Sequence, residues 1–274
     1  METVGVIGAG NMGSMLIEVM LEQKAVSEEK MHVFNRTYSK SQSLKDKFTS
    51  IHTHTSVKEI VQEASMLFLC IRPGDYEGIL PELRKHLTGS HTLLTITSPV
   101  SGEELDSLPC RKTGRVVPTI LNKTGNGPFL VTFGNNWGKE EKQFFMQWLN
   151  TFGSPVEIEE ECIRAASDIV SCGPAFFSFL LEQFIQAAVK ETQISKEEAE
   201  MMTEQMIICF GNLLDSGVYN LQTLKEKVNV PGGITGAGLG VLRKKSAGMF
   251  EEVFQTTHSK FREDKGKMEP LFNK

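Results

Sequence analysis

Several common sequence features are scarce or absent in this 274-residue chain. Its five cysteines are an odd number and include no Cys-x-x-Cys pair, which argues against a disulfide framework and a zinc-finger site. There is no basic excess, since 29 Lys and Arg residues face 34 Asp and Glu residues. The resulting net charge of −5 argues against a general nucleic-acid binder. The six histidines form no ligand-like cluster, so we expect no metal site.

The chain also lacks a long hydrophobic run and a recognisable secretory leader. Its longest apolar stretch, 174–189, is interrupted by Glu182, Gln183 and Gln186 and is shorter than the ~20 residues that cross a bilayer. We expect this stretch to be a buried helix. The first residues have no charged region before an apolar core, so we expect a strand there and not a signal peptide. A globular cytoplasmic protein with no membrane partner is the prediction.

The clearest positive feature is a glycine-rich turn near the start of the chain. An apolar segment, 3–7, runs directly into Gly8-x-Gly10-x-x-Gly13, and a helical pattern follows. In this context the first glycine permits a tight turn, the second lets backbone approach a pyrophosphate, and the third lets the helix pack closely on its strand. The helix start then offers free N–H groups to phosphates. The sequence therefore predicts a dinucleotide site formed by Gly8, Gly10, Asn11, Met12 and Gly13.

The residues after the second expected strand favour one dinucleotide over the other. An NAD site places Asp or Glu near the end of that strand, where it binds the ribose hydroxyls. This chain has Asn35-Arg36-Thr37 there. A guanidinium can hold a 2′-phosphate that a carboxylate would repel, and Asn35, Thr37 and Ser39 can add neutral hydrogen bonds. We therefore expect NADP(H) in preference to NAD(H); the alternative is that Arg36 is an ordinary solvated loop cation.

Residues 1–158 alternate short apolar runs with helical patterns, which predicts a doubly wound, mostly parallel α/β sheet of the Rossmann type that binds NADP. The expected strands are 3–7, 31–35, 66–71, 92–97, 115–118, 129–133 and 155–158, and the expected helices are 12–24, 39–48, 56–63, 76–86 and 139–151. Ligands bind outside the carboxyl ends of such strands. Cys70, Arg72 and Pro73 follow one of these ends and join the expected cofactor site.

The pattern changes to long helices after residue 158. We expect an all-α domain over 159–266 that binds substrate and forms dimers, followed by a disordered tail over 267–274. Ser195 and Glu198 form a capping box before a helix with an apolar stripe. The helix after Pro174 is apolar on nearly every side, which predicts cover from a second subunit; burial within one chain is the alternative.

The glycine-rich turn, Asn35-Arg36 and the segment 224–239, with Pro231-Gly-Gly-Ile-Thr235, together resemble the pyrroline-5-carboxylate reductase family. Segments 71–73, 115–118 and 173–175 extend the resemblance over nearly the whole chain, and 131–134 and 166–176 resemble its late competence protein branch, ComER. The resemblance implies a Rossmann domain, an all-helical dimerisation domain and NAD(P)H-dependent reduction of a cyclic imine, 1-pyrroline-5-carboxylate, to proline.

The resemblance also implies a substrate site at Val230, Gly232, Gly233, Ile234 and Thr235. Backbone N–H groups of the Pro-Gly-Gly turn can converge on a carboxylate. The Thr235 hydroxyl can reach the imine nitrogen, where charge develops during hydride transfer, so Thr235 is the catalytic candidate. A Thr at a helix start is more commonly only a cap. The chain departs from the family pattern at Val230 (usually Ser), at Thr119 (usually Asn) and at Ser98-Pro99 (usually Ala-Gly).

Two functions follow from these residues. The first is an NADPH-dependent imine reductase acting on a small-molecule substrate as a homodimer. The second is a catalytically weak or inactive competence-associated regulator that keeps the NADP site and acts through partners. A β-hydroxyacid dehydrogenase would need a catalytic Lys at the domain junction, and Lys190 lies at the far end of its helix. The sequence leaves the physiological substrate and any assembly beyond a dimer open.

Overall fold

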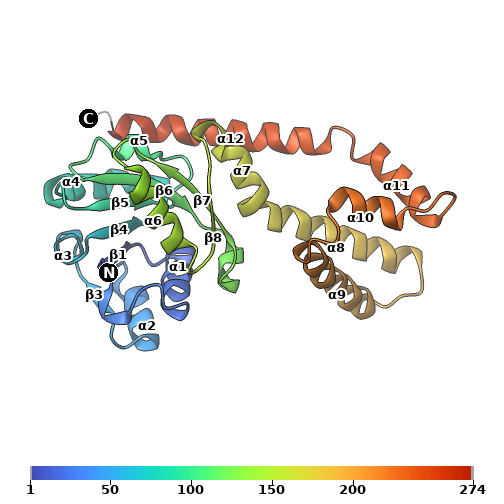
Figure 1. Cartoon of the computed structure of the whole chain (residues 1–274), viewed down its shortest axis with the longest axis horizontal. Helices are drawn as coiled ribbons and strands as arrows, with labels where there is room; N and C mark the ends of the chain where they lie inside the picture. Colours follow the sequence, from blue (N-terminus) through green and yellow to red (C-terminus); the bar gives the residue numbers. More distant parts are fainter. Residues whose placement is uncertain (1, 273–274) are drawn as a thin grey trace. The chain divides into compact units, whose positions relative to one another are not determined.

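The computed structural model describes residues 2–272, which form two compact units. The sheet unit contains the chain up to Ser171 together with the part from Thr257 onward, and the helical unit is Cys172–Thr256 (Figure 1). The helical unit is therefore shorter than the span 159–266 expected from the sequence. The reason is packing, because Ile163 is buried in a cluster with Val117 and Leu130 of the sheet unit, and Phe261 packs against the same cluster.

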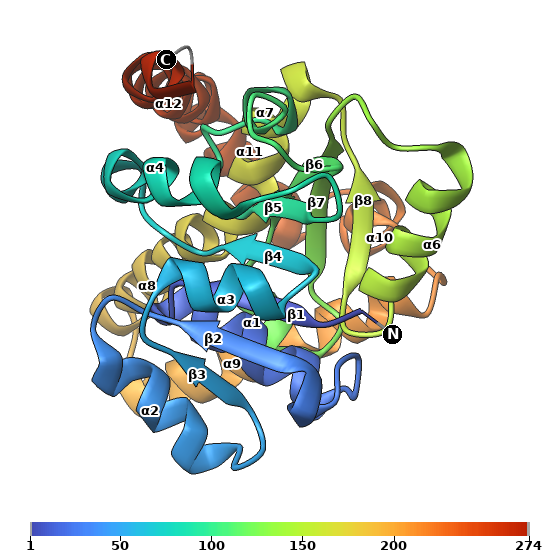
Figure 2. The same ribbon diagram turned by 90° about the vertical axis from the view of Figure 1, so that its left-hand side faces the viewer.

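The sheet unit is built on eight strands in the order β3-β2-β1-β4-β5-β6-β7-β8 (Figure 2). Their bounds are β1 Val4–Ile7, β2 Met31–Phe34, β3 His52–His54, β4 Met66–Leu69, β5 Thr92–Thr95, β6 Lys112–Val117, β7 Pro128–Phe133 and β8 Ser154–Glu157. The β6–β7 pair is antiparallel and the other pairs are parallel. The predicted Rossmann-type sheet is confirmed. Strand β3 was not predicted, because its three residues, His-Thr-His, carry no apolar alternation.

Helices cover both faces of this sheet. They are α1 Asn11–Glu22, α2 Tyr38–Lys47, α3 Val57–Glu63, α4 Tyr76–His86, α5 Gly102–Leu105, α6 Lys139–Leu149 and α7 Ile163–Ser167, the last continuing into a π-helical turn over Asp168–Cys172. Helix α5 was not predicted, because four residues are too few to show a helical period. Its signal was local, a capping box in which Ser101 and Glu104 exchange hydrogen bonds.

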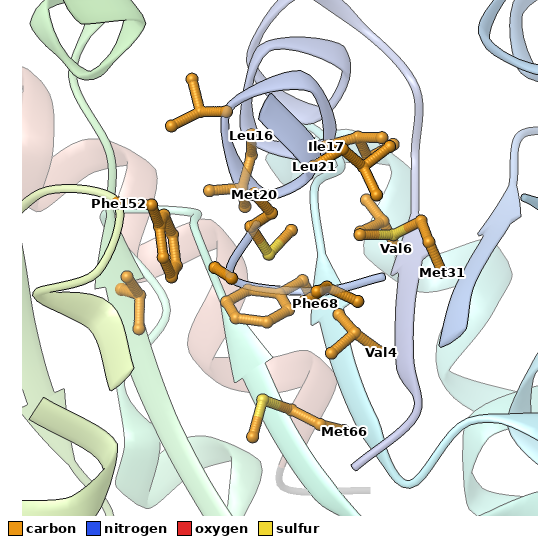
Figure 3. Close-up of a cluster of buried hydrophobic side chains, with 14 of the residues drawn as sticks. Val4, Val6, Leu16, Ile17, Met20, Leu21, Met31, Met66, Phe68 and Phe152 are labelled. Carbon is orange, nitrogen blue, oxygen red and sulfur yellow. The ribbon is translucent and has the colours of Figure 1, made fainter. Parts of the chain in front are cut away.

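The two cores of the sheet unit follow from the strand period of two. Val4 and Val6 of β1 point to the face covered by α1 and α6, where Leu16, Met20 and Phe68 are fully buried (Figure 3). Ile7 belongs to the core on the opposite face, under α3 and α4. Both faces are buried, which is why these strands read as nearly continuous apolar runs in the sequence.

The predicted disordered tail is wrong for residues 267–272. Helix α12 spans Met249–Phe272, and its last turns pack on α4 of the sheet unit. Met268 and Phe272 are buried, the Phe272 ring meets the Tyr76 ring edge-on at 5.9 Å, and Arg84 Nη2 donates to the Leu271 carbonyl at 3.0 Å. These contacts hold an otherwise charged segment against the sheet unit. The tail's remaining positions, 273–274, lie outside the described residues.

The helical unit contains α8 Gly173–Glu191, α9 Lys196–Asp215, α10 Leu221–Val228 and α11 Ile234–Lys245. The capping box predicted at Ser195 is confirmed, with Ser195 Oγ accepting from the Glu198 amide and the Glu198 carboxylate accepting from the Ser195 amide. The other helices of its unit leave much of α8 open, since Phe177, Phe179 and Phe184 are each more than half exposed among the described residues. One continuous helical stretch, Glu160–Glu191, is by length and composition alone able to span a membrane.

Candidate functional site

A cleft of about 400 Å³ opens at the carboxyl ends of β1, β4 and β5. Open parallel sheets bind ligands at this edge. Six residues predicted to bind the cofactor line the cleft, namely Gly10, Asn11, Met12, Cys70, Arg72 and Pro73. The remaining lining residues are Lys40, Ile71, Ile96, Thr97, Ser98 and Pro99. The glycine-rich turn and the segments after β4 and β5 therefore surround one cavity within the sheet unit.

The three glycines of the turn have different surroundings. Gly8 has a φ of +109°, and a Cβ there would lie 2.3 Å from the Cys70 carbonyl oxygen. A Cβ at Gly13 would lie 1.9 Å from the Gly8 carbonyl oxygen, so α1 can approach β1 only without a side chain. A Cβ at Gly10 would meet nothing within 4 Å, because this residue faces the open cleft. Gly10 is also the N-cap of α1 and provides no side-chain cap, which leaves the helix-start N–H groups to an anion.

Asn35, expected to contact the cofactor, makes two hydrogen bonds to backbone. Its Oδ1 accepts from the Ala9 amide at 2.9 Å, and its Nδ2 donates to the Thr37 carbonyl at 2.8 Å. The side chain thereby ties the glycine-rich turn to the loop that follows β2. Asn35 therefore supports the glycine-rich turn, and Thr37 stands at the exposed start of α2.

Arg36 lies at the surface with a side chain 86% exposed, and its Nη1 is 2.9 Å from Asp75 Oδ1. Asp75 belongs to a 3-10 turn, Pro73–Asp75, which connects β4 to α4. Sequence reasoning missed this pairing, because the two residues are 39 positions apart and no local pattern links them. Lys40 of α2 was also missed, although a second cation four residues after Arg36 was a readable signal of a basic edge to the cleft.

The segment after β5 lines the cleft with an unpaired hydroxyl and is held by a buried arginine outside the cleft lining. Arg115 of β6 is fully buried, and its guanidinium donates to the Ser98 and Val100 carbonyls and pairs with Glu160. These bonds fix the segment after β5. Ser98 Oγ is buried with no hydrogen-bond partner among the described residues, so a polar ligand in the cleft could satisfy it. The open backbone at Gly10 and this hydroxyl fit a dinucleotide.

The surroundings of Cys70 and Thr119 show what each of these residues does in the fold. Burial raises the pKa of the Cys70 thiol far above its ordinary value, so this cysteine is a neutral part of the cleft wall and no nucleophile. Thr119 is buried, and its Oγ1 accepts from the Leu121 amide while its own amide donates to Asn122 Oδ1. The Thr119 hydroxyl is used as a cap for the turn Ile120–Thr124, which accounts for one departure from the family pattern.

The five predicted substrate residues lie together at the start of α11 in the helical unit. Gly232 has a φ of +72°, and Gly233 is the N-cap of α11, with no side-chain cap. The Gly233 amide donates to the Val230 carbonyl at 3.0 Å, which closes the turn. Thr235 is exposed in the first helical turn, and Ile234 beside it is 94% exposed. The turn therefore presents uncapped N–H groups and a hydroxyl on the surface of this unit.

Known families match two parts of the chain. Residues 160–264 match the family described as pyrroline-5-carboxylate reductase dimerisation. Residues 3–99 match the family described as NADP oxidoreductase, coenzyme F420-dependent. The first match covers the helical unit and the second covers the glycine-rich turn and the loops that carry Arg36 and Asp75.

Relatives align over almost the full chain. ComE operon protein 4 of Bacillus subtilis is 42% identical, covering 95% of this chain and 96% of that protein. Pyrroline-5-carboxylate reductase 3 of the same organism is 24% identical, with the same coverage of 95% and 96%. A solved pyrroline carboxylate reductase of Plasmodium falciparum with NADP bound superposes with a TM-score of 0.80 at 22% identity, covering 97% of this chain and 98% of that one. This last similarity confirms the fold.

Proposed function

Because this chain belongs to the pyrroline-5-carboxylate reductase family, we propose that it is an NADPH-dependent reductase of a cyclic imine, with 1-pyrroline-5-carboxylate as the first substrate to test. The single observation that supports this most is the glycine-rich turn. Gly8 and Gly13 are packed against backbone, while Gly10 is open to a cleft of about 400 Å³ at an uncapped helix start.

In this proposal the cleft of the sheet unit holds NADPH, which supplies a hydride when bound. The N–H groups of residues 11–13 bind the pyrophosphate through the start of α1. The Arg36 guanidinium binds the 2′-phosphate, and Lys40 adds a second positive charge at the cleft. Cys70, Arg72 and Pro73 form the wall beside the turn, and Asn35 holds the turn in shape.

The substrate is assigned to the turn before α11. The uncapped backbone N–H groups in the first turn of α11, which begins after Gly233, are proposed to bind the carboxylate, and the exposed Thr235 hydroxyl is proposed to donate a hydrogen bond to the imine nitrogen. When the hydride adds to the imine carbon, the electron pair of the C=N π bond moves to the nitrogen, which then takes up a proton. A donor held there stabilises the charge as it develops, which is where a hydrogen bond lowers the barrier.

We also propose a cytoplasmic homodimer formed through the C-terminal helices. Supporting this are the match of residues 160–264 to a dimerisation family and the exposed aromatic residues of α8. Glu182, Gln183 and Gln186 interrupt the apolar surface of α8, and they favour a protein partner over a lipid environment. The partner for this surface is a second copy of the chain.

The test is NADPH oxidation with 1-pyrroline-5-carboxylate by the wild type, Thr235→Ala and Thr235→Ser. We expect turnover by the wild type and a loss of about 10²-fold in kcat for Thr235→Ala, because one transition-state donor is removed. Thr235→Ser keeps the hydroxyl and should retain most of the rate, and NADPH affinity should be the same in all three proteins. A wild type that binds NADPH and reduces no cyclic imine would falsify the reductase proposal.

One observation favours the second candidate, a regulator that keeps the nucleotide site. Val230 replaces the serine that the family pattern has before Pro-Gly-Gly, and its side chain is 58% exposed beside the proposed carboxylate site. Val230→Ser separates the two candidates further. If the wild type is inactive and Val230→Ser gains imine reduction, the regulator with a lost substrate contact is supported.

A further inference from the structure

Asp75 stands beside the proposed 2′-phosphate site and has no part in the function derived above. We propose that Asp75 determines coenzyme specificity, by pairing with Arg36 when no 2′-phosphate is present and by accepting hydrogen bonds from the ribose hydroxyls of NADH. The chain would then use both NADPH and NADH. This inference rests on the proposed nucleotide site.

Arg36 and Asp75 form an ion pair at one edge of the sheet. Arg36 follows β2 and Asp75 precedes α4, so two separate βα connections bring opposite charges to the same edge of the sheet. Arg36 Nη1 donates to Asp75 Oδ1 at 2.9 Å, and the two side chains are 86% and 36% exposed. A carboxylate missing from the end of β2 is thus supplied from a different loop.

Asp75 is the fixed member of its ion pair with Arg36. Its amide donates to the Arg72 carbonyl at 2.9 Å, within the turn that forms the cleft wall. The next residue, Tyr76, is fully buried, and its hydroxyl is 2.5 Å from Thr95 Oγ1 of β5. Asp75 is therefore anchored through its neighbours, whereas the long, exposed Arg36 side chain is free to change partner.

The charge of Asp75 affects NADPH and NADH in opposite ways. A 2′-phosphate on Arg36 must compete with the Asp75 carboxylate for the guanidinium, and it then stands near a like charge. The same carboxylate suits NADH, because an acidic residue that accepts from the ribose hydroxyls is what NAD sites use. The pair is exposed, so the repulsion is moderate and is screened by salt. Asp75 should therefore weaken NADPH binding and strengthen NADH binding without abolishing either.

The test is titration of the full chain with NADPH and with NADH in the absence of imine, using wild type and Asp75→Asn. The substitution keeps the size of the side chain and removes its charge. We expect NADPH to bind about three- to tenfold more tightly and NADH about three- to tenfold more weakly, and the NADPH effect should shrink at high salt. Glu77→Gln is the matched control, because it removes an exposed charge from the first turn of α4 and Arg36 pairs with Asp75 and not with Glu77.

The outcomes separate this inference from the proposed function. Wild type that binds NADPH, with Asp75→Asn unchanged or no different from Glu77→Gln, overturns the role of Asp75 and leaves the nucleotide site standing. Wild type that binds neither nucleotide overturns both. Asp75→Ser provides the same charge removal if Asp75→Asn fails to fold, and Arg36→Ala should lose NADPH affinity while Asp75 still supports NADH.

Discussion

The two units of this chain differ in how far each buries its most apolar helix. Helix α1 of the sheet unit has twelve residues, of which seven are buried, from Gly13 to Leu21. Helix α8 of the helical unit has nineteen residues, and of these Gly173 alone is buried within the described chain. The helices are similarly apolar in sequence, yet one is covered by strands of its own chain and the other is not. Apolar composition therefore predicts that a helix is buried, while the partner that buries it depends on the assembly.

The open surface of the helical unit is shaped as a groove. It has a volume of about 380 Å³ and lies between α8 and α9, lined by Ser178, Leu181, Glu182, Ile185, Thr203, Glu204, Ile207 and Ile208. A surface of this kind is costly in water unless another apolar surface covers it. The homodimer proposed above gives it that cover, and three experiments test how far the contrast between the units extends.

The largest effect is expected from a charge placed in the groove. Ile208 is 58% exposed in the single chain, and Ile208→Glu would bury a carboxylate in the proposed dimer interface. We expect the dimer to become a monomer at micromolar concentration, measured by light scattering. Ile120→Glu is the control, because Ile120 is 49% exposed on the sheet unit and should leave the dimer intact. A wild-type monomer, or equal behaviour of the two variants, would contradict the contrast.

A smaller effect is expected inside the sheet unit, where burial is complete in one chain. Gly13→Ala would put a Cβ 1.9 Å from the Gly8 carbonyl oxygen, and we expect it to lower the free energy of unfolding by about 3 kcal/mol. Gly78→Ala is the matched change in α4, where a Cβ meets nothing within 4 Å, and it should raise stability by about 0.5–1 kcal/mol. Denaturant unfolding measures both. Similar stabilities for the two variants would show that the turn is not tightly packed.

The smallest effect is a pH dependence at the β2–β3 edge of the sheet unit. Burial first, and then His54 and His52, lower the pKa of His32 to about 4. His32 Nδ1 lies 2.9 Å from His54 Nε2, and Glu59 and Glu63 oppose the lowering at His54. Because the folded pKa lies below the ordinary 6.5, the unfolded chain binds the proton more readily. The stability that depends on neutral His32 is present above pH 6.5 and is lost as the pH falls toward 4.

We expect this group to account for about 2 kcal/mol of stability lost between pH 7 and pH 4.5. His32→Val should flatten that part of the pH profile of unfolding, because valine fits a buried strand position and does not titrate. A profile that is equally steep with and without His32 would place the acid sensitivity elsewhere.

Much of the sheet unit was predictable because its signals are local. The glycine-rich turn, the apolar strands and the capping boxes each occupy a few consecutive residues whose chemistry fixes the backbone. The failures have equally local causes. Strand β3 lacks an apolar period, α5 is too short to show one, and the end of α12 carries too few apolar residues to be told from a frayed tail.

The candidate site also combines residues that local motifs predict with contacts that they do not predict. Motifs at fixed spacings predicted Gly10, Arg36 and the Pro231–Thr235 turn as parts of the site, and the structure has Gly10 at the cleft. The coenzyme contact of Asn35 stays a prediction, and the structure adds the hydrogen bonds of its side chain to the Ala9 amide and the Thr37 carbonyl. Sequence reasoning also missed Lys40 at the cleft. The contacts of Asn35 and the position of Lys40 depend on how distant segments fold together.

Residue patterns alone were enough to predict the family, the sheet with its glycine-rich turn and the helical region that follows. Each of these depends on short-range periodicity and on backbone freedom at a few glycines. The folded chain was needed to find that Asp75 meets Arg36, that Phe272 packs on Tyr76 and that the described residues leave most of α8 open. Such contacts join segments far apart in the chain or depend on what is left without a neighbour, and no local pattern of residues encodes them.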